Sequence, residues 1–374
     1  MGRLKAAPTT VGAKATPSDR AANTPSSSIA GATTSSSSIV GAAFRRPWGR
    51  LIFLPCLLAG CSGNQAIFNP QGPAARSIAT LGWTLLAISG VVYSLVMVAL
   101  IWALARRRDA RDGEPATTRA ITRTVTLASF ATVIVLVVLS VVSVVAGRGL
   151  TSPSGPGALQ VDVIGHQWWW DFQYTDVTPS DYVTTPNELH IPVGVPVVLK
   201  VQSRDVIHSF WVPNLHGKRD LIPGQITHTW IQADRPGVYR GQCAEFCGHE
   251  HARMAFAVVA EPMDSFLQWI AHQRQPAAEP ATDEQRRGRD VFLQSTCVSC
   301  HTIRGTNAGS HVGPELTHVG SRLTIAAGTL PNTRGHLSGW IADPQSIKPG
   351  ARMPANNLAP ADLQAVLTYV RSLR

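Results

Sequence analysis

The sequence predicts a multi-domain protein in which two membrane-spanning helices precede an all-β module and an all-α module. Two apolar runs in the N-terminal half are each close to the 20 or so residues that cross a bilayer. Residues 158–264 contain short β-branched and aromatic runs separated by Pro and Gly. Residues 283–374 begin and end with segments that have the amphipathic pattern of helices.

The charge is distributed unevenly along the 374 residues. The chain has 33 Lys and Arg against 23 Asp and Glu, a net charge of +10. Residues 1–60 hold seven bases and one acid, whereas residues 158–264 hold seven bases and twelve acids. A nucleic-acid-binding protein presents a basic face on its folded domain. Because the basicity is concentrated near the N-terminus, we expect no nucleic-acid partner.

Residues 1–60 have the features of a targeting segment. A Ser/Thr/Ala/Gly-rich tail without periodicity leads to three arginines, a short apolar run at 51–58 and the sequence Leu-Ala-Gly-Cys ending at Cys61. This ending resembles a bacterial lipoprotein signal, which implies cleavage before Cys61 and a lipid on its sulfur. The alternative is an ordinary signal sequence in which the cysteine has no role.

Residues 61–157 predict a transmembrane hairpin with helices at about 77–105 and 124–146. Neither run has an interior charge, and the segment between them contains six arginines and three acids. The positive-inside rule places that segment in the cytoplasm and everything after Arg148 on the outer side. The alternative is a buried hairpin in the core of a soluble protein.

The β-rich region carries the first cluster of ligand-type residues. The motif is Cys-Ala-Glu-Phe-Cys-Gly-His-Glu-His-Ala-Arg-Met over residues 243–254, with His208 thirty-five residues upstream. Thiolates, imidazoles and a thioether form a soft donor set that suits copper better than hard cations. A zinc site, or a disulfide between Cys243 and Cys247, is the alternative.

This motif closely resembles the dinuclear CuA site of cytochrome c oxidase subunit II, whose domain is a cupredoxin-like β-sandwich or barrel. The resemblance implies that Cys243 and Cys247 bridge two coppers. It also implies that the remaining ligands are His208, His251, Met254 and the backbone carbonyl of Glu245. The Glu245 side chain would help to hold a magnesium ion at the border with subunit I.

The resemblance extends to Gly-His-Gln-Trp-Trp-Trp at 165–170, in which Trp168 matches the tryptophan through which the family receives electrons. Packing in the core is the alternative role of these tryptophans. In a strand, Trp168 and Trp170 would share one face and Trp169 would occupy the other.

The C-terminal module contains Cys297-Val-Ser-Cys300-His301, the Cys-x-x-Cys-His signature of covalent c-type haem. The order of its helices, a Gly-Pro-Glu-Leu loop and an Arg-Met-Pro sequence resemble a class I cytochrome c domain. That resemblance implies Met353 as the sixth iron ligand, a pairing that raises the iron potential. His311, His318 and His336 are competitors for that position, and a redox Cys-x-x-Cys is the alternative for the cysteines.

The combination resembles subunit II of a caa-type cytochrome c oxidase, with residues 265–282 as a linker between the modules. It implies electron flow from an external donor, a cytochrome c or a bc-type complex, to haem c, CuA and then haem a in subunit I. Oxygen reduction and proton pumping, the translocase activity, would belong to the complex, with no catalytic residue in this chain. The implied location is the bacterial cytoplasmic membrane, with both redox modules outside.

Two other functions fit the same motifs. One is a CuA-containing component of a nitric or nitrous oxide reductase. The other is a copper-binding or copper-delivery lipoprotein without turnover. The opposite net charges of residues 158–264 and 265–374 further predict electrostatic attraction between the modules, which salt would screen.

Overall fold

A computed structural model describes residues 63, 65–106, 115–151, 158–175 and 182–374. The predicted leader and the lipidation site at Cys61 lie outside the described residues.

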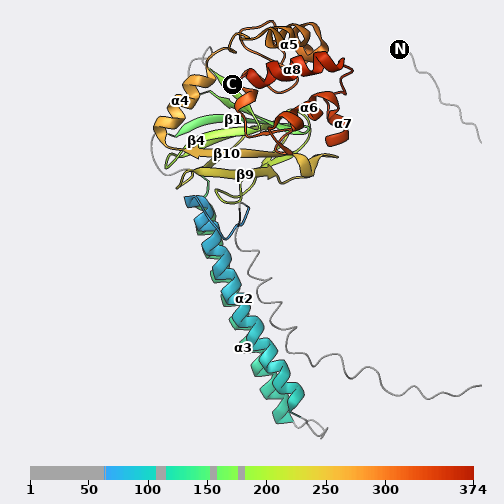
Figure 1. Ribbon diagram of the computed structural model, residues 1–374. Helices are drawn as coiled ribbons and strands as arrows, with labels where there is room; N and C mark the ends of the chain where they lie inside the picture. Colours follow the sequence, from blue (N-terminus) through green and yellow to red (C-terminus); the bar gives the residue numbers. More distant parts are fainter. Residues whose placement is uncertain (1–62, 64, 107–114, 152–157, 176–181) are drawn as a thin grey trace, which may run out of the picture. The chain divides into compact units, whose positions relative to one another are not determined.

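Helices α2 (Pro73–Ala105) and α3 (Pro115–Arg148) form the apolar hairpin and run alongside each other (Figure 1). Both are long and apolar enough to cross a membrane. Helix α3 starts nine residues before the predicted apolar run, so Arg119 and Arg123 lie on its first turns. The helix continues there because backbone hydrogen bonding does not require apolar side chains, whereas bilayer insertion does.

The β-module consists of two five-stranded sheets. One sheet has the order β3-β2-β1-β5-β8 and the other β4-β10-β9-β6-β7. The first sheet contains β1 (Leu159–His166), β2 (Trp169–Tyr174), β3 (Val183–Pro186), β5 (Val197–Ser203) and β8 (Thr227–Ile231). The second contains β4 (Glu188–Pro192), β6 (His208–Trp211), β7 (Arg219–Leu221), β9 (Gly237–Cys243) and β10 (Ala255–Glu261).

The inner faces of the two sheets form one core. Alternate residues of β1 and β2 point inward, so that Val161, Val163, Trp170 and Phe172 are fully buried. Phe210 and Phe256 from the second sheet pack against Trp170. The predicted cupredoxin-like sandwich is confirmed, and its core encloses Cys243, Cys247 and Met254.

Helix α4 (Met263–Gln273) occupies the first half of the range predicted as a linker. Phe266 and Ile270 join the β-module core, and Trp269 stacks on His190 with ring centroids 3.9 Å apart. The following residues are held by the C-terminal module, since the amide of Ala277 donates to the carbonyl of Arg304. The segment between the two modules is therefore short and anchored at both ends.

The C-terminal module is mainly helical. Its elements are α5 (Asp283–Gln294), η3 (Thr296–Ser299), η4 (Val319–Ser321), β11 (Thr324–Ile325), β12 (Leu330–Pro331), α6 (Arg334–Ala342), α7 (Pro344–Ile347) and α8 (Pro360–Ser372). Helices α5 and α8 lie against each other (Figure 1). Their contact requires Gly288, where a Cβ would lie 2.0 Å from the carbonyl oxygen of Ala365.

Candidate metal centres and the contact between them

Strand pairing and one tight loop assemble the first ligand cluster. Antiparallel pairing of β6 with β9 sets Phe210 opposite Cys243, which brings His208 near the end of β9. The loop after β9 then folds back so that Cys247, His251 and Met254 face the same point. Gly165 on β1 leaves space for the imidazole, because a Cβ there would lie 2.8 Å from Cδ2 of His208.

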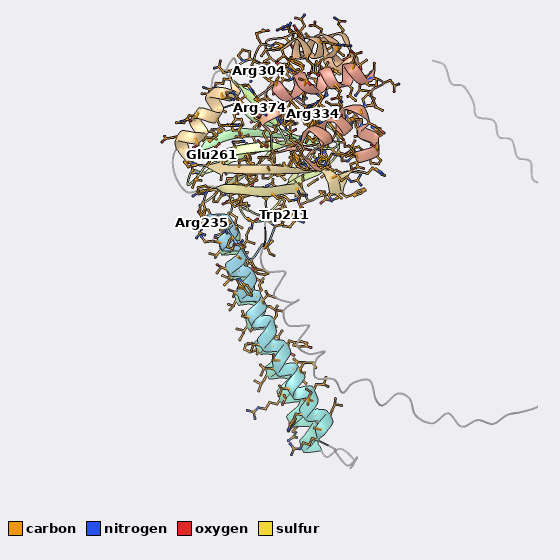
Figure 2. The ribbon with its side chains drawn as sticks, viewed as in Figure 1. Trp211, Arg235, Glu261, Arg304, Arg334 and Arg374 are labelled. Carbon is orange, nitrogen blue, oxygen red and sulfur yellow. The ribbon has the colours of Figure 1, made fainter. Side chains whose placement is uncertain are left out.

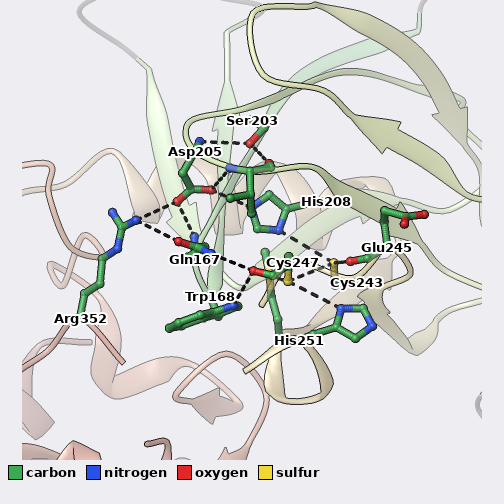
Figure 3. A network of polar contacts seen from close by, with 12 residues as sticks. Gln167, Trp168, Ser203, Asp205, His208, Cys243, Glu245, Cys247, His251 and Arg352 are labelled. Carbon is green, nitrogen blue, oxygen red and sulfur yellow. Dashed lines mark hydrogen bonds and ion pairs between the residues drawn. The ribbon is translucent and has the colours of Figure 1, made fainter. Parts of the chain in front are cut away.

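The sulfur and nitrogen atoms of this cluster lie close enough to share metal ions (Figure 3). Sγ of Cys243 is 3.8 Å from Sγ of Cys247 and 3.9 Å from Nδ1 of His208. Sγ of Cys247 is 3.6 Å from Nδ1 of His251 and 3.8 Å from Sδ of Met254. The two thiols are not joined in a disulfide. The carbonyl oxygen of Glu245 lies 3.2 Å from Sγ of Cys243.

The two thiols differ in their affinity for a proton. The hydrogen bond with Cys247 lowers the pKa of Cys243, and the contacts with His208 act in the same direction against the effect of burial. That same hydrogen bond, together with burial, raises the pKa of Cys247. Cys243 is therefore the thiol that gives up its proton more readily, and a bound cation would need both thiols as thiolates.

Asp205 orients the buried histidine of the cluster. Its Oδ1 lies 2.9 Å from Nε2 of His208, which leaves Nδ1 directed at the thiols. Burial alone would lower the pKa of His208, but the hydrogen bond to Asp205 raises it on balance. Burial likewise would raise the pKa of Asp205, yet its bonds with His208 and with the amides of Gln167 and Val206 lower it to about 2. A carboxylate that fixes a ligand histidine is a usual feature of metal sites.

Trp168 lies in the turn between β1 and β2, and not on a strand as alternation predicted. Its Nε1 donates to the carbonyl oxygen of Cys247 at 3.0 Å, and Nε2 of Gln167 donates to the same oxygen at 2.8 Å (Figure 3). The neighbouring tryptophans have packing roles, because Trp170 is fully buried and Trp169 stacks on His166. Trp168 thus bonds to the Cys247 carbonyl from the turn, whereas Trp170 reaches the Met254 carbonyl from the core, at 3.4 Å.

The outer side of the ligand loop is exposed. The Glu245 side chain faces solvent, and Phe246 beside it is 76% exposed. Both side chains therefore lie on the solvent-facing side of the ligand loop.

The second cluster surrounds η3. Cys297 and Cys300 are half-buried and unpaired. Nδ1 of His301 lies 2.7 Å from the carbonyl oxygen of Pro314, so that Nδ1 donates and Nε2 is the nitrogen left for a metal. Burial lowers the pKa of His301, which favours the neutral, ligating form. Met353 follows α7, and its carbonyl accepts a hydrogen bond from Nε2 of Gln345 at 2.7 Å.

The three competing histidines lie in other surroundings. His311 is exposed. Nε2 of His318 faces the carbonyl oxygen of Gln275 at 3.1 Å, and the ring packs beside His272. His336 is exposed at the start of α6, with Nδ1 3.1 Å from the Thr333 hydroxyl.

The two modules meet around Lys348, which is 3% exposed. Its Nζ donates to the carbonyl oxygens of Trp168 at 2.7 Å and Arg253 at 2.8 Å. Burial lowers the pKa of Lys348 to about 8. A buried cation that satisfies two backbone acceptors gives the contact a defined position, which long-range attraction alone would not provide.

Backbone groups and an arginine extend the same contact. The amide of Ala255 donates to the carbonyl of Ala327 at 2.9 Å, and the amide of Leu323 donates to Oε2 of Glu188 at 2.9 Å. Nη2 of Arg352 lies 3.2 Å from Oε1 of Gln167 and 3.4 Å from Oδ2 of Asp205. The loop that carries Met353 therefore touches the groups that surround the first cluster.

Comparisons with known proteins agree with this architecture. Residues 159–261 match the family model "Cytochrome C oxidase subunit II, periplasmic domain", and residues 285–374 match "Cytochrome c". A cytochrome c oxidase subunit 2 of Alkalihalophilus pseudofirmus is 35% identical over 338 residues, covering 87% of this chain and 96% of the relative. The chain belongs to the cytochrome c oxidase subunit 2 family. Its Bacillus subtilis member is 27% identical, over 87% of this chain and 96% of the relative.

A solved structure covers part of the same region. The periplasmic domain of subunit II from Bradyrhizobium japonicum shares 30% identity and a TM-score of 0.30, covering 32% of this chain and 96% of that domain. As a member of the cytochrome c oxidase subunit 2 family, this chain is the electron-input subunit of a haem-copper oxidase. Its two domain matches imply copper in the β-module and haem in the C-terminal module. Its two apolar helices anchor it in a membrane, with the matched periplasmic domain outside.

Sequence reasoning identified the ligand-type residues of this subunit 2 chain but missed the residues that hold them. The missed residues are Gln167, Asp205, Lys348 and Arg352. Asp205 had a local signal, since a carboxylate three residues before a ligand-type histidine can reach its second nitrogen. Lys348 and Arg352 had no local sequence signal, because their partners are 95 to 185 positions away in the sequence.

Proposed function

We propose that this chain receives electrons at a covalently bound haem c and passes them to a dinuclear copper centre, for delivery to subunit I. The observation that carries this proposal is the set of two unpaired thiols, two imidazoles and one thioether around a single point, in which all but the half-buried His251 are buried. Such soft donors suit copper, and the thioether has no place in an ordinary structural zinc site.

In this proposal Cys243 and Cys247 would hold both copper ions through their thiolates, and His208, His251, Met254 and the Glu245 carbonyl would complete the ligand set. The protein contributes rigidity, because His208 is 0% exposed and Met254 is 1% exposed within the sandwich core. Two coppers bridged by thiolates supply a one-electron carrier whose geometry changes little on reduction. Asp205 holds the His208 ring, and Gln167 and Trp168 hold the Cys247 carbonyl, so the ligands are in position before an electron arrives.

For the haem, we propose that Cys297 and Cys300 would form the thioether links and that His301 and Met353 would bind the iron. The hydrogen bond from His301 to Pro314 supports this role, since it sets the tautomer and ring orientation that iron ligation requires. We favour Met353 over His318 and His336, since Nε2 of His318 faces the Gln275 carbonyl and His336 lies exposed at the start of α6.

Trp168 is the proposed point of electron input to the copper site. Its indole is one hydrogen bond from the Cys247 carbonyl, and its own carbonyl accepts the bond from Lys348 of the haem module. These two bonds give a short series of contacts from the Met353 loop to a copper ligand. An external donor, a cytochrome c or a bc-type complex, would then deliver electrons to the haem module.

On the opposite side, we propose that Glu245 and Phe246 face subunit I. The exposed carboxylate of Glu245 supports a share in a magnesium site at that border, as the family resemblance implies. The chain would lie in the bacterial cytoplasmic membrane with both redox modules outside, and Cys61 would carry a lipid. The arginines at the cytoplasmic end of the hairpin support that orientation.

The copper-delivery alternative is not favoured, because a delivery protein needs exposed, exchangeable ligands and the thiols here are 5% and 3% exposed. Purification of the complex from native membranes tests the proposal. We expect subunit I to accompany this chain, covalent haem to persist after denaturation, and a mixed-valence copper EPR signal shared between two nuclei. A single-copper or zinc site, or haem released by denaturation, would contradict it.

A further inference from the structure

The feature that carries a further inference is Arg352, the residue immediately before the proposed haem ligand Met353. Arg352 belongs to the haem module, yet its guanidinium forms hydrogen bonds with two residues of the β-module (Figure 3). Those partners are Gln167 and Asp205, neither of which is a proposed copper ligand.

Each partner holds one part of the copper ligand set. Asp205 accepts from Arg352 at Oδ2, 3.4 Å away, and binds Nε2 of His208 through Oδ1 at 2.9 Å. Gln167 presents Oε1 to Arg352 at 3.2 Å and donates from Nε2 to the Cys247 carbonyl at 2.8 Å. A single side chain of the haem module therefore reaches both a histidine and a cysteine of the copper site, through one intermediate residue each.

From this geometry we propose that Arg352 is a positioning residue that raises the reduction potential of the copper centre when the haem module is docked. The inference rests on the copper assignment proposed above and concerns a residue outside the ligand set.

The direction of the effect follows from charge. An arginine beside Asp205 draws part of the carboxylate charge away from the His208 N–H. Without it, the carboxylate would pull more strongly on that proton and give His208 more imidazolate character, which stabilises the oxidised metal. The positive charge of Arg352 itself also disfavours the more positive, oxidised state. Both contributions raise the potential.

The magnitude is limited by solvent. The Arg352 side chain is 64% exposed and that of Asp205 14%, so the contact is a partly screened ion pair. Pairs of this kind change equilibrium constants by roughly two- to fivefold. At about 59 mV per tenfold change for one electron, this corresponds to about 20 to 40 mV.

The test compares the midpoint potential of the copper centre in the intact oxidase with three variants. The potential is measured from the copper EPR signal during redox titration, so that a change in the haem signal beside Arg352 is not counted as a change in the copper potential. Arg352→Gln should lower the potential by about 20 to 40 mV. Arg352→Lys keeps the charge and should lie between the wild type and Arg352→Gln. Arg334→Gln is the matched control, because Arg334 on α6 contacts Gln364 within its own module (Figure 2).

Hydrogen exchange at Ala255, whose amide crosses the contact, shows whether the modules remain docked. An unchanged copper potential in Arg352→Gln, or an equal shift in Arg334→Gln, would overturn the inference. A shift that appears only together with lost protection of Ala255 would also overturn it, since separation of the modules would then explain it. Absence of the mixed-valence signal in the wild type would instead refute the proposed copper assignment.

Discussion

Replacing Lys348 with methionine should loosen the contact between the haem module and the copper module. Methionine has a similar length and no donor, so the Trp168 carbonyl would lose this donor, and the Arg253 carbonyl would keep only the Thr329 hydroxyl at 3.4 Å. A buried acceptor left unsatisfied costs about 1–3 kcal/mol, so the loss lies between about 1 kcal/mol for Trp168 alone and about 6 kcal/mol for both carbonyls.

Part of this cost is offset, because the substitution also removes a buried cation. Burial lowers the pKa of Lys348 from its ordinary value of 10.5 to about 8. At 1.36 kcal/mol for each pKa unit, the charged amine costs about 3 kcal/mol in the docked state at neutral pH. The net loss of docking free energy is therefore at most about 3 kcal/mol.

Hydrogen exchange of the intact protein measures this loss directly. The amides of Ala255 and Leu323 donate across the contact, so their protection reports separation of the modules. We expect their exchange to accelerate by up to about a hundredfold, at about 1.4 kcal/mol for each factor of ten. The control is Lys200→Met, since Lys200 pairs with Asp162 inside the β-module. Unchanged protection at both amides in Lys348→Met would refute the reasoning.

Three further predictions concern pH, the copper ligands and the haem fold. The Lys348 amine loses its proton near pH 8 when the modules are docked and near pH 10.5 when they are apart, so docking should tighten between these pH values by up to about 3 kcal/mol. The protection of the Ala255 amide, corrected for intrinsic exchange, should therefore rise with pH in the wild type and stay constant in Lys348→Met. Met254→Leu should change the copper EPR signal and slow oxygen uptake while the haem remains reducible by a small donor, and an unaltered signal would remove Met254 from the ligand set. Gly288→Ala places a Cβ 2.0 Å from the Ala365 carbonyl oxygen and should destabilise the haem module by about 1–3 kcal/mol. The haem absorption band should then be lost at a lower temperature. Gly335→Ala is the control, because nothing lies within 4 Å of a Cβ at that position.

The contact around Lys348 also refines the expectation drawn from net charge. Opposite charges of the two modules predicted an attraction that salt would screen. The structure adds a buried cation and backbone hydrogen bonds, which depend on shape and desolvation and respond little to ionic strength. Net charge predicts an attraction between the modules, but it does not define which residues form the interface.

The sequence by itself determined the modules and the candidate ligands, because both are encoded locally. Apolar length predicts membrane helices, and Cys243 to Met254 lie on one loop whose spacing brings them to a common point. The Cys-x-x-Cys-His motif is equally local. Helix α4 was missed because its amphipathic turns follow a Pro and precede a Pro/Ala-rich segment, and only packing against Tyr174 and His190 shows that it belongs to the β-module.

Only the tertiary structure decided which residues contact those candidate ligands and where the two modules touch. Arg352 and Gln167 are 185 positions apart, and Lys348 and Trp168 are 180 apart. No local pattern encodes such pairs, because they arise when two separately folded modules present complementary surfaces. The candidate ligands could therefore be predicted from the sequence, whereas the series of contacts between the Met353 loop and Cys247 depends on how the modules pack.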